Sequence, residues 1–194
     1  YCNKFYPISI IEKEQILEIC KIEKISGITS IASDLAVTTL NFVANKLNLI
    51  GNSPRSGFLS TNKYEMRNAF KSHGILVPCF TLSSNLNQMI DISSFKYQVI
   101  VKPVDRSGSK GITFVTYEKD LQSALNMAVR ESFANQAIIE EFINGKEISV
   151  ESISWKGKHY IIAYTDKVTS GPPHFVELEH HQPSEIVDSG ILKE

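Results

Sequence analysis

The sequence predicts an α/β segment followed by an α+β domain that is built on antiparallel strands. Patterns for a helix, a strand and a second helix follow one another in residues 1–50, the order of a parallel α/β unit. From residue 97 onward, short apolar runs typical of strands flank one amphipathic helix. We therefore expect residues 1–55 to be the C-terminal part of an α/β domain and residues 56–194 to form a second domain with antiparallel sheets.

The first part is expected to hold two helices with a strand between them. Residues 9–12 fit a capping box, which predicts a helix that includes Cys20. Residues 27–33 predict a short buried strand. Asp34 can then cap a second helix, whose apolar positions recur at helical spacing as far as Leu47.

The second part is expected to begin after a linker. The linker is the turn-rich stretch of residues 51–57. Ser60 or Thr61 is expected to cap a third helix that stops at Gly74. Residues 75–80 predict a strand at a sheet edge, because a proline interrupts them. The remaining expected elements are strands at residues 97–102, 112–116 and 137–142, a helix at about 118–132, and a hairpin of residues 147–155 and 159–166.

The composition argues against several classes of protein. The formal net charge is −1 and both signs are mixed along the chain, so the basic surface of a general nucleic-acid binder is missing. No apolar run approaches the ~20 residues of a membrane span, so we expect no membrane contact. The three cysteines are widely spaced and are expected to be reduced in a cytoplasmic protein. Nothing in the sequence sets the oligomeric state, and a homodimer is possible.

The most informative stretch joins two predicted strands at residues 103–111. Nine residues are long for a hairpin, and long loops in compact domains are often functional. The loop carries two serines and two glycines: Ser107, Gly108, Ser109 and Gly111. Backbone N–H groups in such a loop can form a concave anion site, and Lys102 would place an ammonium beside it. A mobile polar loop beside a surface lysine is the open alternative. The pattern is not that of a Walker P-loop, because a strand follows it.

Charged side chains elsewhere allow two interpretations each. Glu140, Glu141, Glu147 and Glu151 lie in a β-rich segment, either in a cleft or on a solvated sheet face. Lys63 is expected in the first turn of a helix, where a cation opposes the helix dipole. A bound anion would relieve that conflict, although exposed lysines are tolerated at such positions.

A polar loop at residues 167–176 leads to a short strand with two histidines. Adjacent residues of a strand point to opposite faces, so at most one of His180 and His181 is expected to face a cleft. No GxSxG elbow is present, which leaves a serine hydrolase without support.

Taken together, these segments resemble the ATP-grasp superfamily from about Asn41 to Pro183. The order of the motifs carries the resemblance: a helix with a lysine, a strand ending Val-Lys-Pro, a glycine-serine loop, Glu-Glu-Phe-Ile, and Gly-Lys-Glu-Ile-Ser-Val-Glu. The stretch from Lys167 to Pro183 is similar to the L-amino-acid ligases. Residues 28–52 resemble the preceding domain of the carbamoyl-phosphate synthase and biotin carboxylase branch. The resemblance implies ATP-grasp lobes after the end of a pre-ATP-grasp domain.

The resemblance also implies roles for particular residues. Lys63 and Lys102 match the lysines that hold ATP phosphates, and the loop from Ser107 to Gly111 matches the flap that covers them. The adenine would be recognised by Glu140, Glu141, Phe142 and Ile143. Glu147 matches the acid that binds the ribose. Lys167, Thr169 and His180 would lie near a small carboxylate substrate, which the L-amino-acid ligases imply to be an amino acid.

The resemblance implies ATP and Mg²⁺ as cofactors of an ATP-dependent carbon–nitrogen ligase, which activates a carboxylate as an acyl phosphate. The family places its metal ligands in a Glu and a Glu-x-Asn pair, with catalytic arginines nearby. Residues 151–194 contain no Glu-x-Asn. We therefore expect the metal ligands outside this chain, and a fragment that does not turn over. A biotin carboxylase-type or carbamoyl-phosphate synthase-type enzyme, a non-catalytic ATP-binding module, and a structural domain without a ligand remain alternatives.

Overall fold

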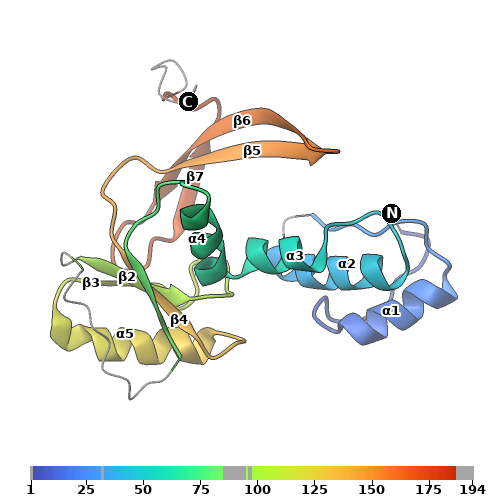
Figure 1. Ribbon diagram of the computed structural model, residues 1–194, viewed down its shortest axis with the longest axis horizontal. Coiled ribbons are helices and arrows are strands. Elements are labelled where there is room, and N and C mark those ends of the chain that lie inside the picture. The colour runs from blue at the N-terminus through green and yellow to red at the C-terminus, as the bar shows by residue number, and fades with distance from the viewer. Residues whose placement is uncertain (1, 32, 85–94, 96–97, 187–194) are drawn as a thin grey trace.

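The computed structural model describes residues 2–31, 33–84, 95 and 98–186, and it consists of a helical part followed by two antiparallel sheets (Figure 1). The helical part holds α1 (Lys13–Ile22), α2 (Asp34–Lys46) and α3 (Pro54–Thr61). Figure 1 shows it beside the sheets, with α4 (Lys63–Ser72) leading from one to the other. Among the described residues, no helix is both long and apolar enough to cross a membrane.

Helices α1 and α2 pack through a small apolar core of Leu17, Cys20 and Val43. The capping box at residues 9–12 was a wrong prediction, because α1 begins at Lys13 and its cap makes no side-chain bond. The strand predicted at residues 27–33 was also wrong: the described residues of that range form no strand. Ile28 packs against the helical core instead of joining a sheet, whereas Ile31 is 90% exposed.

The linker predicted at residues 51–57 instead contains the start of α3. The Ser53 side chain accepts a hydrogen bond from the Ser56 amide at 3.1 Å, and Pro54 occupies the first turn, where its missing N–H costs nothing. Helix α4 is capped by Asn62, which accepts from Glu65 N at 3.0 Å, and not by Ser60 or Thr61. The hydroxyls of those two residues donate to the Gly57 carbonyl inside α3, at 3.0 Å each.

The first sheet has the strand order β1-β4-β2-β3, and all its pairs are antiparallel. Its strands are β1 (Phe80–Ser83), β2 (Val99–Pro103), β3 (Thr113–Val115) and β4 (Ala137–Glu141). Helix α5 (Glu118–Glu131) covers one face, and the core between them includes Val101, Leu125, Ala128 and Ile139. Strand β1 lies at the sheet edge as expected, but it begins at Phe80, and residues 75–79 form no strand.

The second sheet holds β5 (Ile148–Trp155), β6 (Lys158–Thr169) and β7 (Glu177–His181), in that order. The predicted hairpin is confirmed: Lys156 (φ 49°) and Gly157 (φ 76°) both adopt the positive φ that tight two-residue turns require. Figure 1 shows the two sheets facing each other, with α4 between their ends. The domain boundary proposed at residue 55 falls inside α3 and stays a prediction.

Gly111 is expected to be the more sensitive of two loop glycines. Both Gly108 (φ 66°) and Gly111 (φ 72°) have left-handed backbones, so alanine strains each by about 1–2 kcal/mol. A Cβ on Gly111 would also lie 2.9 Å from Pro103 Cγ and 3.0 Å from Glu131 Cβ, whereas one on Gly108 meets nothing within 4 Å. Urea unfolding should therefore give a loss of about 2–4 kcal/mol for Gly111→Ala and a smaller loss for Gly108→Ala. Equal losses would contradict this account of close packing at Gly111.

Candidate functional site

A cleft of about 1220 Å³ lies between the two sheets. This volume exceeds the ~300–1000 Å³ of ordinary ligand pockets, so it has room for a large ligand. Strands β2 and β4 line one side, and β6, the end of β7 and the segment after it line the other. Its polar and charged lining includes Arg67, Lys102, Glu140, Glu141, Lys146, Glu147, Asp166, Lys167, Thr169, His180, His181, Gln182 and Glu185.

A buried carboxylate paired with two cations lies on the first-sheet side of the cleft. In the β2–β4 register Ile100 lies opposite Glu140, so Lys102, two residues further along β2, shares the face of Glu140. The Lys102 ammonium pairs with Glu140 Oε2, and Arg67 Nε from α4 lies 2.6 Å from Glu140 Oε1. Glu140 is only 4% exposed, which makes this an ion pair largely removed from water.

The two cations keep Glu140 ionised. Burial acts to raise the pKa of the Glu140 carboxyl, but the charges and hydrogen bonds of Lys102 and Arg67 outweigh it and hold the pKa below its ordinary value of 4.5. The three side chains together carry a net positive charge. The cleft wall around them therefore favours a ligand with anionic groups.

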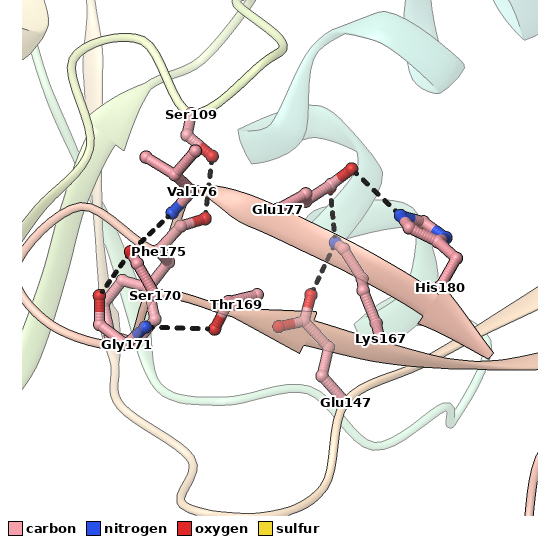
Figure 2. A network of polar contacts seen from close by, with 10 residues as sticks. All are labelled: Ser109, Glu147, Lys167, Thr169, Ser170, Gly171, Phe175, Val176, Glu177 and His180. Carbon is pink, nitrogen blue, oxygen red and sulfur yellow. Dashed lines mark hydrogen bonds and ion pairs between the residues drawn. The ribbon is translucent and has the colours of Figure 1, made fainter.

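A second charged network lies on the other side of the cleft (Figure 2). Lys167 Nζ lies 2.7 Å from Glu147 Oε1 and 2.7 Å from Glu177 Oε1, and His180 Nε2 lies 3.5 Å from Glu177 Oε2. The strand register explains this convergence, because Lys167 lies opposite His180 and Thr169 opposite Glu177. Burial acts to lower the pKa of Lys167, but its bonds to the two carboxylates outweigh burial and raise it. Lys167 therefore stays a cation in the cleft.

The segment that precedes β7 ties the glycine-serine loop to the second sheet. The Ser109 hydroxyl donates to the Phe175 carbonyl at 2.9 Å, as Figure 2 shows, and Phe114 N donates to Pro173 O at 3.1 Å. The Phe114, Phe142 and Phe175 rings form an aromatic cluster, with the Phe114 and Phe142 centroids 4.9 Å apart. Phe142 and Phe175 line the cleft, so part of its wall is flat and apolar.

Most of the sequence-predicted site residues line this one cleft. They are Lys102, Glu140, Glu141, Phe142, Ile143, Glu147, Lys167, Thr169 and His180. Lys63 and Ser107 instead line a second, smaller cavity. Ser109 bonds to a residue of the cleft wall, while Gly108 and Gly111 line neither cavity. His180 and His181 both contribute to the lining of the cleft, and which of the two side chains faces it stays a prediction.

Lys63 lies close to the cleft without lining it. Its backbone N–H donates to Val104 O at 2.7 Å, and its ammonium donates to the Arg106 carbonyl. Burial lowers the pKa of Lys63, and the nearby charge of Lys102 lowers it further. The two lysines are thus near enough to interact electrostatically, and the assignment of both to phosphate binding stays a prediction.

Sequence reasoning missed Arg67 and Glu177. Arg67 follows Lys63 by four residues on the same helix, so its position could have been found from helical spacing. Glu177 could not, because its approach to Lys167 depends on an irregularity in the β6–β7 register between Val168 and Thr169. In the described ranges, no three His, Cys, Asp or Glu side chains gather as a metal site.

Two antiparallel sheets thus enclose a cleft whose wall carries an ion-paired, largely buried lysine. A family model for the ATP-grasp domain matches residues 60–176, and the chain belongs to this family. The match covers β1 to β4, both long strands of the second sheet, and the segment that contacts the glycine-serine loop.

Known proteins that are similar to this chain include ligases and synthetases. A D-alanine–D-alanine ligase of Flavobacterium johnsoniae is 31% identical over 135 residues, which are 66% of this chain and 40% of that protein. The L-amino acid ligase of Bacillus licheniformis superposes with a TM-score of 0.77 at 23% identity, over 97% of this chain and 46% of that one. An N5-carboxyaminoimidazole synthetase of Staphylococcus aureus, solved with ADP, superposes with a TM-score of 0.75 at 17% identity, over 97% of this chain and 49% of that one. The chain spans less than half the length of these relatives.

A stability measurement tests the ion pairs around Glu140. Glu140→Gln leaves Lys102 and Arg67 without their carboxylate, and breaking a buried pair costs about 3–5 kcal/mol, with the lower end expected here because Arg67 is 26% exposed. Because the folded-state pKa is depressed, the Glu140 contribution is present above pH 4.5 and is lost as the pH falls through the folded pKa. The difference in unfolding free energy between wild type and variant should therefore shrink on acidification. Glu141→Gln is the matched control, and an equal loss there would contradict the assignment.

Proposed function

We propose that this chain forms the ATP-binding cleft of an ATP-dependent carbon–nitrogen ligase, which activates a carboxylate as an acyl phosphate. The observation that carries the proposal is the meeting of Lys102, Glu140 and Glu147 in one cleft between two sheets. ATP-grasp ligases in general use ATP and Mg²⁺, which agrees with the cofactors inferred from the sequence.

The cleft offers complementary groups for each part of ATP. Lys102 would face the phosphates, with Lys63 nearby, since cations offset the charge of a polyphosphate. The adenine would lie along Glu140 to Ile143, against the aromatic wall of Phe142 and Phe175. The Glu147 carboxylate can accept hydrogen bonds from the two ribose hydroxyls. The Ser107 to Gly111 loop would cover the phosphates and exclude water.

The reaction would proceed in two steps, formation of the acyl phosphate and attack by the amine. A carboxylate oxygen of the substrate attacks the γ-phosphorus, the bond from that phosphorus to the bridging oxygen breaks, and ADP leaves. An amine then attacks the acyl phosphate, which releases phosphate and a proton and forms an amide. Phosphoryl transfer of this kind depends mainly on positioning and charge stabilisation, which the paired lysine of the cleft can supply.

The substrate is proposed to be a small carboxylate, with an amino acid favoured. Lys167 is a cation inside the cleft, and Thr169 and His180 line the same wall. The names of the relatives, D-alanine–D-alanine ligase and L-amino acid ligase, support an amino acid. A biotin carboxylase-type reaction would instead require bicarbonate and biotin. A cytoplasmic location and a homodimer stay predictions.

Thermal unfolding with ATP and Mg²⁺ tests the proposal. A ligand that binds only the folded chain adds about 2.7 kcal/mol of stability at 100 times its Kd. We expect a rise in Tm for the wild type and a much smaller rise for Lys102→Met, because the variant lacks the charge that faces the phosphates. The quantity compared is the ligand-induced shift, since Lys102→Met also removes the ion pair with Glu140 and lowers the starting Tm.

Lys158→Met is the matched control, because Lys158 is an exposed lysine at the distant end of the β5–β6 hairpin. It should shift with ATP as the wild type does. An ATP-induced shift that survives in Lys102→Met would place the phosphates elsewhere. The absence of any shift in the wild type would count against ATP binding by this chain.

A further inference from the structure

Arg67 and Lys102 contact different oxygens of the same buried carboxylate. Arg67 Nε lies 2.6 Å from Glu140 Oε1, whereas the Lys102 ammonium pairs with Glu140 Oε2. The two cations also come from different elements, since Arg67 belongs to α4 and Lys102 to β2. Each ion pair can therefore persist when the other one breaks.

The sheet around Glu140 offers little else that could compensate its charge. Glu140 lies in β4 between β1 and β2, and the residues opposite it on those strands are the apolar Phe80 and Ile100. The carboxylate is nearly excluded from water. Lys63 interacts with it electrostatically, but the Lys63 ammonium donates to the Arg106 carbonyl. An ionised Glu140 without a paired cation would therefore be costly.

Two acceptors would compete for the ammonium of Lys102. In the chain without a ligand the ammonium is held by Glu140, and under the proposed function it faces the phosphates of ATP. A lysine carries its charge at the end of a flexible four-carbon stem, so the ammonium can turn from one acceptor to the other. That turn would leave Glu140 without a cation unless a second one stays in place.

Arg67 lies on a helix that is fixed against the first sheet. Helix α4 packs on β1, where the Tyr64 and Phe80 rings meet edge to face with their centroids 5.6 Å apart. Tyr64 precedes Arg67 by three residues, so both side chains lie on the same side of the helix. A guanidinium also keeps its charge over the whole pH range in which the chain is folded. Arg67 is therefore the cation suited to remain with Glu140.

We propose that Arg67 is a positioning residue of the nucleotide site, which keeps Glu140 paired when Lys102 turns toward the phosphates of ATP. The inference rests on the proposed function, because it concerns the lysine that would hold those phosphates. Arg67 acts through Lys102 and does not itself have to touch the nucleotide. Without Arg67, either Lys102 remains with Glu140 or Glu140 takes up a proton as ATP binds, and both alternatives weaken binding.

Isothermal titration with ATP and Mg²⁺ compares the wild type, Arg67→Met, Glu140→Gln and the double variant. Arg67→Met should weaken ATP binding by ~10-fold or more, because Lys102 then has to leave a buried carboxylate unpaired. In the Glu140→Gln background the same substitution should change the affinity by less than ~3-fold, because no carboxylate holds Lys102 there. Arg67 also lines the cleft. A direct contact with the phosphates would give equal losses in both backgrounds and overturn the proposal.

The pH dependence of ATP binding is a readout that a merely structural role of Arg67 would not change. Burial acts to raise the pKa of Glu140, so in Arg67→Met the carboxyl takes up a proton when Lys102 leaves it. The difference in ATP affinity between wild type and Arg67→Met should therefore narrow from about pH 8 to about pH 6. Lys63 and the nucleotide titrate in both proteins, so their effects cancel. A constant difference would overturn the proposal, even if Glu140→Gln fails to fold.

Lys71→Met is the matched control, because Lys71 is an exposed cation one turn further along α4 and does not line the cleft. It should bind ATP as the wild type does. The titrations also separate this inference from the proposed function. ATP binding by the wild type that is undiminished in Arg67→Met would overturn the inference alone. No ATP binding by the wild type would overturn the proposed function and the inference together.

Discussion

The ion-paired Glu140 carboxylate is the interaction on which the cleft depends. It joins β4, β2 and α4 at one point, through Lys102 and Arg67, and it is nearly excluded from water. Taking three charges out of water is costly, so such a group survives only where its partners are in place. The same contacts that stabilise the ion pair fix Lys102 at the cleft wall. When the first sheet folds, Lys102 is therefore already in position to meet a ligand.

The second sheet supplies charges of a different kind. Lys167 is held between Glu147 and Glu177, so these three side chains together carry a net negative charge. The first sheet offers net positive charge, and the second offers carboxylates with partial exposure. A nucleotide has an anionic end and a sugar with hydroxyl donors, and this division of charge suits both. The aromatic rings of Phe142 and Phe175 lie where the two sides meet.

Prediction from the sequence was most reliable for the elements that local backbone geometry decides. The hairpin at Lys156-Gly157, the strands around Lys102 and Glu140, and helix α5 were all predicted, because alternation and turn residues decide them. The strand at residues 27–33 was wrong because strand formation depends on a partner that the segment alone does not reveal. Helix α3 was missed because serine and proline are typical both of linkers and of helix starts.

Side-chain partners were harder to foresee than elements. Lys102 and Glu140 were expected in one site from the order of motifs, but their direct pairing follows from the β2–β4 register. Arg67 lies one helical turn after Lys63, but its pairing with Glu140 depends on how α4 packs on the first sheet, and Glu177 reaches Lys167 through the irregular β6–β7 register. Lys63 was foreseen as a ligand-facing lysine, yet it lines the smaller cavity, since its ammonium turns toward the Arg106 carbonyl.

The hydrogen bonds from Ser109 in the loop and Phe114 in β3 to the segment before β7 couple the first sheet to the second. The two sheets cannot separate at this end while the Phe114 amide remains bonded to Pro173. Hydrogen–deuterium exchange at that amide requires the bond to open. The exchange rate of the Phe114 amide would thus report how often the cleft opens at this end. A ligand that contacts both sheets would lower that rate.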